Sequence, residues 1–234
     1  MEPTADRIRA NLQAVRDRIA AAAARAGRPA DAVRLVAVTK TAGTDAIRTL
    51  LAAGQTDIGE NRAQQLRDRS RELEGAGVRW HMIGRLQRNK VKYVVPTCVM
   101  VHSVDSLRLA EEIDRRAARA DTTATCLLEV NVAGEDQKGG VAPDEAPALA
   151  SRAAALPHVD LAGLMTMAPF VDDPEATRPV FAATRELLAR INREADLPRP
   201  LAELSMGMTQ DFEVAVEEGA TIVRVGSALF AGRG

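Results

Sequence analysis

The chain has 234 residues, of which 46% are hydrophobic and 27% are charged, and this composition excludes a disordered, collagen-like or coiled-coil protein. Lys and Arg together number 31 against 32 Asp and Glu, so the net charge of −1 offers no broad basic surface to nucleic acid. Only 3% of the residues are aromatic, which also argues against a stacking platform for single-stranded nucleic acid.

The first predicted element is a helix over about residues 4–26. Apolar residues recur there at helical spacing, at Ile8, Leu12, Val15 and Ile19. Gly27 and Pro29 end the helix. The N-terminus lacks a signal-peptide pattern, and its longest apolar stretch, residues 19–24, is far too short to span a bilayer. We therefore expect a cytoplasmic protein without a membrane segment.

Short apolar runs then alternate with segments of helical character. Strands are predicted at 33–39, 56–59, 78–84, 97–101, 125–132, 159–165, 201–205 and 221–226. Helices are predicted at 44–53, 61–73, 89–94, 105–120, 143–156, 175–195, 209–218 and 227–230. This alternation predicts a single α/β domain over residues 1–234, a (β/α)8 TIM barrel with an extra N-terminal helix on its outside or base. A doubly wound open sheet is the alternative.

Two cysteines, Cys98 and Cys126, lie far apart in separate apolar runs. Two such thiols do not form a disulfide framework, so both are predicted to be buried free cysteines.

Lys40 interrupts the apolar pattern at the end of the first predicted strand. Val36, Val38 and Lys40 share one face of that strand, which places the lysine at the mouth of a barrel. Partial desolvation there would favour a neutral amine able to attack a carbonyl carbon. The alternative is a strand-end lysine that extends into solvent.

Polar residues also follow the seventh and eighth predicted strands. Arg224 shares a face with Ile222 and Gly226, and a buried arginine requires an anion or another acceptor. Gly226-Ser227, together with Ser205 and Gly207, suits a phosphate site built from the last two barrel loops. The alternative is that these residues are only helix caps.

Four further polar residues lie near predicted strand ends. Asn61 either caps the helix that follows it or reaches a ligand across the mouth. Glu129 is interpreted as a structural residue that neutralises a nearby cation. His81 and His102 each end a predicted strand near the mouth, as hydrogen-bonded wall histidines or as a general base.

Six segments of the chain resemble the YggS/PROSC family of pyridoxal 5′-phosphate (PLP) homeostasis proteins. They are 36–40 (VAVTK), 58–62 (IGENR), 80–90 (WHMIGRLQRNK), 163–167 (GLMTM), 204–211 (LSMGMTQD) and 223–227 (VRVGS). The resemblance implies a fold like the barrel domain of alanine racemase, with Lys40 joined to PLP as an internal aldimine. It implies cofactor contacts from Asn61, Met165, Ser205, Gly207, Arg224, Gly226 and Ser227, with Arg224 facing the pyridine nitrogen and the two serines and Gly226 holding the phosphate.

The resemblance favours a non-enzymatic PLP carrier that releases the cofactor to PLP-dependent apo-enzymes and works as a monomer. The first alternative is a PLP-dependent amino-acid racemase, for which His81 would be the candidate second base because Tyr93 is interpreted as a packing residue. A slow racemase-like side activity is compatible with the carrier. The second alternative is a Schiff-base aldolase that acts on a phosphorylated substrate without PLP.

Overall fold

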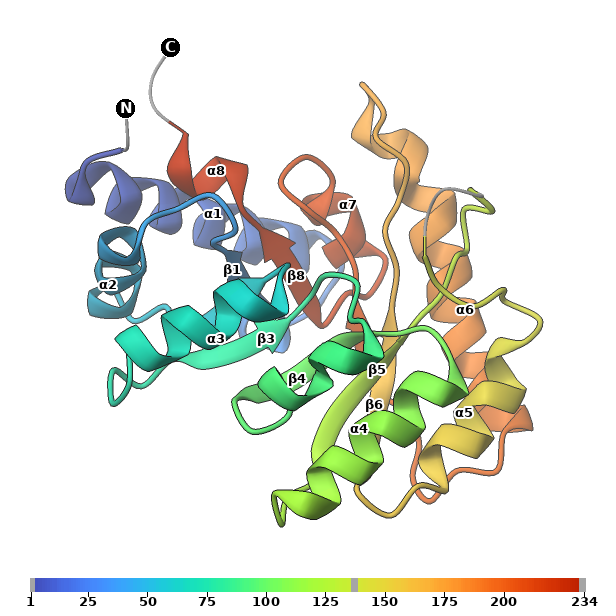
Figure 1. Cartoon of the computed structure of the whole chain (residues 1–234). Coiled ribbons are helices and arrows are strands. Elements are labelled where there is room, and N and C mark those ends of the chain that lie inside the picture. The colour runs from blue at the N-terminus through green and yellow to red at the C-terminus, as the bar shows by residue number, and fades with distance from the viewer. Residues whose placement is uncertain (1–2, 136–138, 232–234) are drawn as a thin grey trace.

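The computed structural model describes residues 3–135 and 139–231, and its centre is a closed barrel of eight parallel strands (Figure 1). Each strand pairs with its neighbours in the chain, and β1 closes the ring by pairing with β8. The strands are β1 Arg34–Val38, β2 Asp57–Glu60, β3 Arg79–Met82, β4 Cys98–Val104, β5 Ala124–Glu129, β6 Val159–Met165, β7 Glu203–Ser205 and β8 Ile222–Val225. The predicted (β/α)8 TIM barrel is confirmed, and the alternative of an open sheet is wrong.

Helices connect successive strands and surround the barrel. The α-helices are α1 Ala5–Arg25, α2 Thr44–Ala52, α3 Ala63–Glu72, α4 Leu107–Arg119, α5 Ala146–Ala154, α6 Arg178–Glu194, α7 Phe212–Glu217 and α8 Ser227–Phe230. Three 3-10 helices complete the described elements, η1 Ala30–Ala32, η2 Arg88–Tyr93 and η3 Pro174–Thr177.

The extra N-terminal helix lies outside the barrel. The side-chain oxygen of Thr4 accepts a hydrogen bond from the backbone N–H of Arg7 and so caps α1. The buried stripe of α1 packs against α2, α7 and α8, which places the helix beside the strands that close the ring (Figure 1). The predicted N-terminal helix is therefore confirmed, and its two partners near the C-terminus are far away in sequence.

Two strands differ from their predicted lengths. β4 continues to Val104, three residues beyond the predicted end, because His102 and Ser103 are polar yet buried in the barrel wall. β5 ends at Glu129 rather than at residue 132, since the backbone at Val130 turns to an isolated bridge with Val141. Hydrophobic periodicity predicts neither buried polar residues inside a barrel nor bridges outside the sheet, so it misplaced both strand ends.

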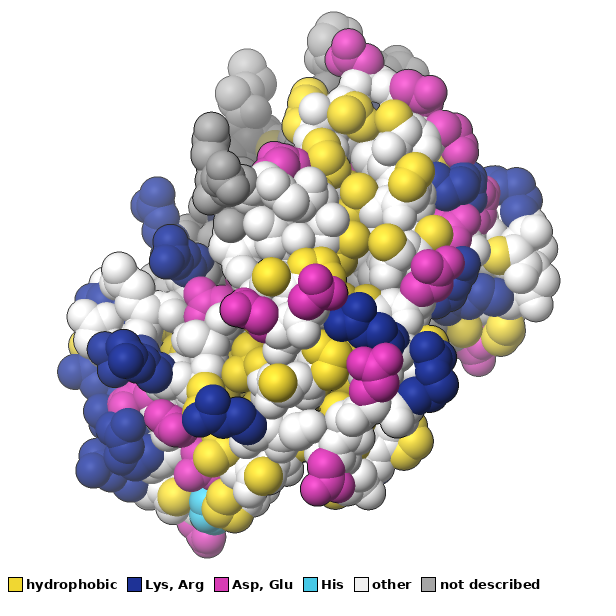
Figure 2. Space-filling view, turned by 90° about the vertical axis from the view of Figure 1, so that its right-hand side faces the viewer, with side chains coloured by type: hydrophobic (Ala, Val, Ile, Leu, Met, Phe, Trp, Pro, Cys, Tyr) yellow, Lys and Arg dark blue, Asp and Glu magenta, His cyan; other side chains and the backbone are white. Residues whose placement is uncertain are grey.

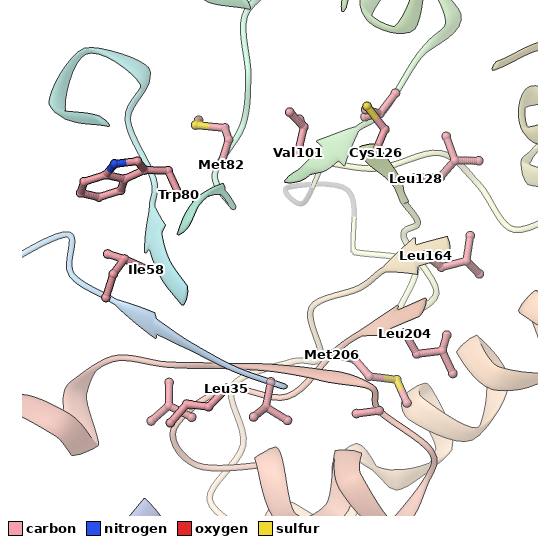
Figure 3. Packing of buried hydrophobic residues seen from close by; sticks show 14 of the residues in the cluster. Leu35, Ile58, Trp80, Met82, Val101, Cys126, Leu128, Leu164, Leu204 and Met206 are labelled. Atoms are coloured by element: carbon pink, nitrogen blue, oxygen red, sulfur yellow. The ribbon is translucent and has the colours of Figure 1, made fainter. Parts of the chain in front are cut away.

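The core has two layers separated by the ring of strands. Outward-facing side chains, such as Leu35 of β1, Ile58 of β2 and Leu204 of β7, point toward the surrounding helices (Figure 3). A smaller apolar cluster occupies part of the inside of the barrel, namely Val36, Ile83, Met100, Leu127, Ala162, Met165 and Ile222. The barrel is therefore packed rather than open along its axis, so a ligand site belongs at its end.

Both cysteines are free thiols, Cys126 being buried and Cys98 half-buried. The prediction of free thiols is thus confirmed for both, and the prediction of burial is correct for Cys126 and wrong for Cys98, which opens β4. No helix in the described ranges is long and apolar enough to cross a bilayer. On the face shown in Figure 2, acidic and basic side chains lie interspersed among apolar ones.

Candidate functional site

Lys40 lies in the turn after β1, at the carboxyl end of the barrel. Its side chain is exposed and lines a cavity of 710 Å³, whose wall also includes Thr44 of α2 and Asp68 of α3. The prediction of a partly desolvated lysine is therefore wrong. The strand ends at Val38, so the lysine leaves the barrel wall and its amine reaches solvent.

Arg69 of α3 fixes the backbone on both sides of Lys40. Its guanidinium donates to the carbonyl oxygen of Thr39 at 2.8 Å and to that of Ala42. The same group forms an ion pair with the fully buried Glu60, whose Oε1 also accepts from the Thr39 hydroxyl at 2.5 Å. Sequence reasoning missed Arg69, because an arginine on a polar helix gives no signal of its long-range partners.

Asn61 directly follows β2, at the carboxyl end of the barrel, and its side-chain oxygen is a buried acceptor. The interpretation of Asn61 as a helix cap is wrong, since Arg62 precedes α3 and makes no side-chain cap bond. The Oδ1 atom of Asn61 is buried without a hydrogen-bond partner. Gly84 allows this arrangement, because a Cβ at that position would collide with the backbone of Asn61. A buried acceptor without a partner costs free energy unless a ligand supplies the donor.

Arg224 of β8 is buried inside the barrel, with 4% of its surface exposed. Its guanidinium donates to Ser205 Oγ at 2.7 Å and to the carbonyl oxygen of Thr166 at 2.9 Å. Within the described part of the chain, no carboxylate lies within ion-pair distance of it. Burial lowers the pKa of Arg224 to about 10, against the opposing effects of Asp211 and Glu129, so the group is still a cation at neutral pH. A buried cation whose hydrogen-bond partners are neutral can donate a further hydrogen bond to an acceptor atom of a ligand.

Ser205 and Met165 are neighbours in the ladder between β6 and β7. Met165 belongs to the apolar cluster inside the barrel. The Ser205 hydroxyl is fully buried, at 2.8 Å from His102 Nδ1 and 2.7 Å from Arg224. The hydroxyl expected to hold a phosphate is thus already engaged with two side chains inside the barrel.

The loops after β7 and β8 meet at Thr209. Its Oγ1 atom accepts from the backbone N–H groups of Gly226 and Ala228, at 3.3 and 3.4 Å. A Cβ added at Gly226 would lie 3.2 Å from the Cβ of Val38 and 3.2 Å from its carbonyl oxygen. A larger residue at this position would therefore crowd β1. Ser227 is exposed as the first residue of α8. The Thr209 oxygen thus ties the loops after β7 and β8 together, and its hydroxyl lies beside the exposed start of α8.

Gly207 shapes the same corner, with φ of +92°. A Cβ there would lie 2.6 Å from Cβ of Ala215 in α7. The predicted helix 209–218 begins only at Phe212, because residues 209–211 form the turn that faces β8. Thr209 was not predicted as a site residue, since its position read as the start of a helix.

His81 and His102 lie inside the barrel rather than at its mouth. His81 Nδ1 is 2.9 Å from His102 Nε2, and His81 Nε2 is 2.8 Å from Asp57 Oδ1, at the start of β2. Both rings are fully buried, and burial lowers the pKa of each. The interpretation as hydrogen-bonded wall histidines is confirmed, and a general base at the mouth is wrong for either residue.

Glu129 ends β5 and is 5% exposed. Burial raises the pKa of its carboxyl group, assisted by Asp105 and opposed by Arg224 and Arg85. Arg224 and Glu129 act on each other electrostatically, since each opposes the effect of burial on the pKa of the other. This agrees with the predicted structural role of Glu129 beside a cation.

Comparison with known proteins places this arrangement in a family. The family model for the N-terminal domain of alanine racemase matches residues 10–234. A pyridoxal phosphate homeostasis protein of Aquifex aeolicus is 44% identical over 222 residues, covering 95% of this chain and 96% of that protein. The pyridoxal phosphate homeostasis protein of Escherichia coli K12 is 36% identical over 226 residues, covering 95% of each.

Solved structures give the same result. PipY of Synechococcus elongatus PCC7942 with PLP bound superposes with a TM-score of 0.83 at 35% identity, covering 96% of this chain and 100% of that chain. Alanine racemase of Clostridium difficile 630 shares the fold, with a TM-score of 0.74 at 17% identity, covering 97% of this chain and 60% of that chain. The chain therefore belongs to the alanine racemase N-terminal domain family and, within it, to the pyridoxal phosphate homeostasis proteins.

Proposed function

We propose that this protein binds PLP at the carboxyl end of its barrel, joined to Lys40 as a Schiff base, and releases it to PLP-dependent apo-enzymes. Its relatives are named as homeostasis proteins rather than as enzymes, and PipY carries PLP. The observation that carries the proposal is the buried cation Arg224, whose side-chain partners are neutral groups.

The residues present fit the cofactor at three separate points. Asn61 supplies a buried acceptor without a partner, and Arg224 supplies a charged donor. The exposed Ser227 hydroxyl and the Thr209 hydroxyl, which the N–H groups of Gly226 and Ala228 hold in place, would bind the phosphate. Gly207, two residues before Thr209, and Met165, the ladder partner of Ser205, would complete the wall as packing neighbours.

We assign the Ser205 hydroxyl to Arg224 rather than to the phosphate. The hydroxyl is fully buried and already bridges Arg224 and His102. In this proposal Thr209 takes the phosphate contact that the resemblance gave to Ser205, because its oxygen lies where two backbone N–H groups converge.

PLP when bound supplies a reactive aldehyde and an electron-withdrawing ring. Arg224 donates hydrogen bonds and cannot accept a proton, so it favours an unprotonated pyridine nitrogen and a weak electron sink. Racemisation would also require a second acid–base group beside Lys40. His81 does not fill that role, because it is buried between Asp57 and His102. Both features favour holding the cofactor over turning over an amino acid.

The working unit and the compartment belong to the same proposal. We also propose that the protein works as a monomer. Cys98 and Cys126 are free thiols, which fits a reducing cytoplasm. A carrier in that compartment would also limit reactions of free PLP with stray amines and thiols.

The first test is the absorption spectrum of the purified protein, before and after borohydride, followed by peptide mapping. We expect a visible band that disappears on reduction and a pyridoxyl group on Lys40. Lys40→Ala should abolish the band, whereas Lys92→Ala, which removes an exposed lysine of η2, should keep it. A reduced adduct on another lysine would overturn the assignment of Lys40. No band after addition of PLP would instead favour the aldolase alternative.

A transfer assay then separates a carrier from a catalyst. The loaded protein is mixed with a PLP-dependent apo-enzyme, and recovery of that enzyme's activity is followed against free PLP at equal concentration. Recovery supports the carrier. Steady racemisation of an amino acid by the loaded protein, lost in Lys40→Ala, would support the racemase.

A further inference from the structure

A continuous chain of hydrogen bonds crosses the inside of the barrel from β8 to β2. Arg224 is 2.7 Å from Ser205 Oγ, which is 2.8 Å from His102 Nδ1. His102 Nε2 is 2.9 Å from His81 Nδ1, and His81 Nε2 is 2.8 Å from Asp57 Oδ1. The three middle side chains are fully buried. We call Ser205, His102, His81 and Asp57 the relay.

The two ends of the relay and the neutrality of its rings together set the direction of each bond. Arginine can only donate hydrogen bonds, and an ionised aspartate can only accept them. His81 therefore donates from Nε2 to Asp57, and a neutral His81 accepts at Nδ1 from His102 Nε2. A neutral His102 then accepts at Nδ1 from the Ser205 hydroxyl, whose oxygen accepts from Arg224.

The electrostatics of the residues agree with this direction. Burial lowers the pKa of both His81 and His102, which keeps the rings neutral. Burial opposes ionisation of Asp57, but hydrogen bonds from His81 and Arg79 outweigh it and lower the pKa of its carboxyl group. The relay thus ends in the carboxylate of Asp57, at the opposite end of the barrel from Lys40.

We propose that Asp57, His81 and His102 are positioning residues for Arg224, acting through Ser205. The relay holds the Ser205 oxygen as an acceptor facing the guanidinium, and the Thr166 carbonyl oxygen holds the other nitrogen at 2.9 Å. Two fixed acceptors define the plane of a guanidinium group. This inference rests on the proposed function, in which Arg224 contacts the cofactor ring.

Asp57, the last residue of the relay, is accessible from the end of the barrel opposite Lys40. Asp57 borders a groove of 510 Å³ under α1, together with Arg34, Gln55 and Arg16. A change at Asp57 therefore touches neither Lys40 nor the loops that hold the phosphate. A change in the Arg224 spectra that Asp57→Leu causes and a control variant does not is therefore the signature of the relay.

The first test uses the protein without added cofactor. Long-range 1H–15N correlation spectra should show Nε2–H tautomers for both His81 and His102 at neutral pH. The Nη signals of Arg224 should show slow rotation of the guanidinium. A proton on Nδ1 of either ring, or rapid rotation of Arg224, would overturn the relay whether or not the protein takes up PLP.

The second test compares substitutions at Asp57. Asp57→Asn keeps an oxygen acceptor for His81, whereas Asp57→Leu removes it. We expect Asp57→Leu to change the tautomers, free the rotation of Arg224 and speed release of PLP about tenfold, and Asp57→Asn to stay near the parent. The control is Asp160→Leu, which removes another acidic residue from the start of a barrel strand, where it pairs with Arg199.

The outcomes separate the relay from the proposed function. Equal release rates and equal Arg224 spectra in Asp57→Leu and Asp160→Leu would overturn the relay. If the parent protein takes up no PLP, the proposed function fails, and the Arg224 spectra of the same variants still decide whether the relay positions the guanidinium.

Discussion

The guanidinium of Arg69 forms an ion pair with the fully buried carboxylate of Glu60. The same guanidinium bonds the backbone of Thr39 and Ala42. Lys40 thus sits in a turn whose two sides are tied to one arginine from α3. The lysine side chain is exposed, while the backbone that carries it is held firmly.

Arg69→Met should therefore destabilise the protein, because it leaves the Glu60 carboxyl group buried without its cation. We expect a loss of about 3 kcal/mol in the free energy of unfolding, measured by urea denaturation. The control Arg71→Met changes an exposed arginine of the same helix and should cost less than about 0.5 kcal/mol. Equal losses in the two variants would contradict the role given to Arg69.

Gly207→Ala should destabilise the turn after β7 for two reasons. The backbone has φ of +92°, and the new Cβ would lie 2.6 Å from Ala215. We expect a loss of about 3 kcal/mol, with weaker PLP binding. Gly54→Ala is the matched control, since Gly54 has φ of +76° and open space around it, and should cost about 1 kcal/mol. A similar cost at both positions would show that the contact with Ala215 is unimportant.

Thr209→Val keeps the shape of the side chain and removes the oxygen that accepts from Gly226 and Ala228. In a PLP titration followed by absorbance, we expect about tenfold weaker binding. Thr209→Ser keeps the hydroxyl and should stay within about threefold of the parent. If Thr209→Ser and Thr209→Val weaken PLP binding to the same extent, the Thr209 hydroxyl is not a phosphate contact.

The buried histidines predict a loss of stability in mild acid. Burial lowers the pKa of His81 and His102, so the unfolded chain binds protons that the folded protein excludes. The free energy of unfolding should then fall as the pH drops below about 6.5, by up to about 1.4 kcal/mol per pH unit for each histidine. His102→Gln should show a shallower slope between about pH 6.5 and 5. His158→Gln, outside the relay, serves as the control, and an unchanged slope in His102→Gln would contradict the linkage.

Part of the site was predictable because its residues break a strong local pattern. Lys40, Asn61 and Arg224 each stand at or near the end of an apolar strand, where barrels place their functional groups. The local pattern left open whether the Lys40 side chain is exposed, since that depends on β1 ending at Val38. Whether Asn61 caps α3 was decided by where that helix begins, and helix starts are poorly defined by sequence.

The amino-acid sequence by itself determined the order of the eight strands and the helices between them, because apolar periodicity is a property of residues close together in the chain. It did not determine the partners of the polar residues inside the barrel. Ser205 lies 103 positions from His102 and Arg224 lies 58 positions from Thr166, so only closure of the barrel brings these groups together. Once they are buried, each donor needs an acceptor within reach, and the tertiary structure alone decides which one it finds.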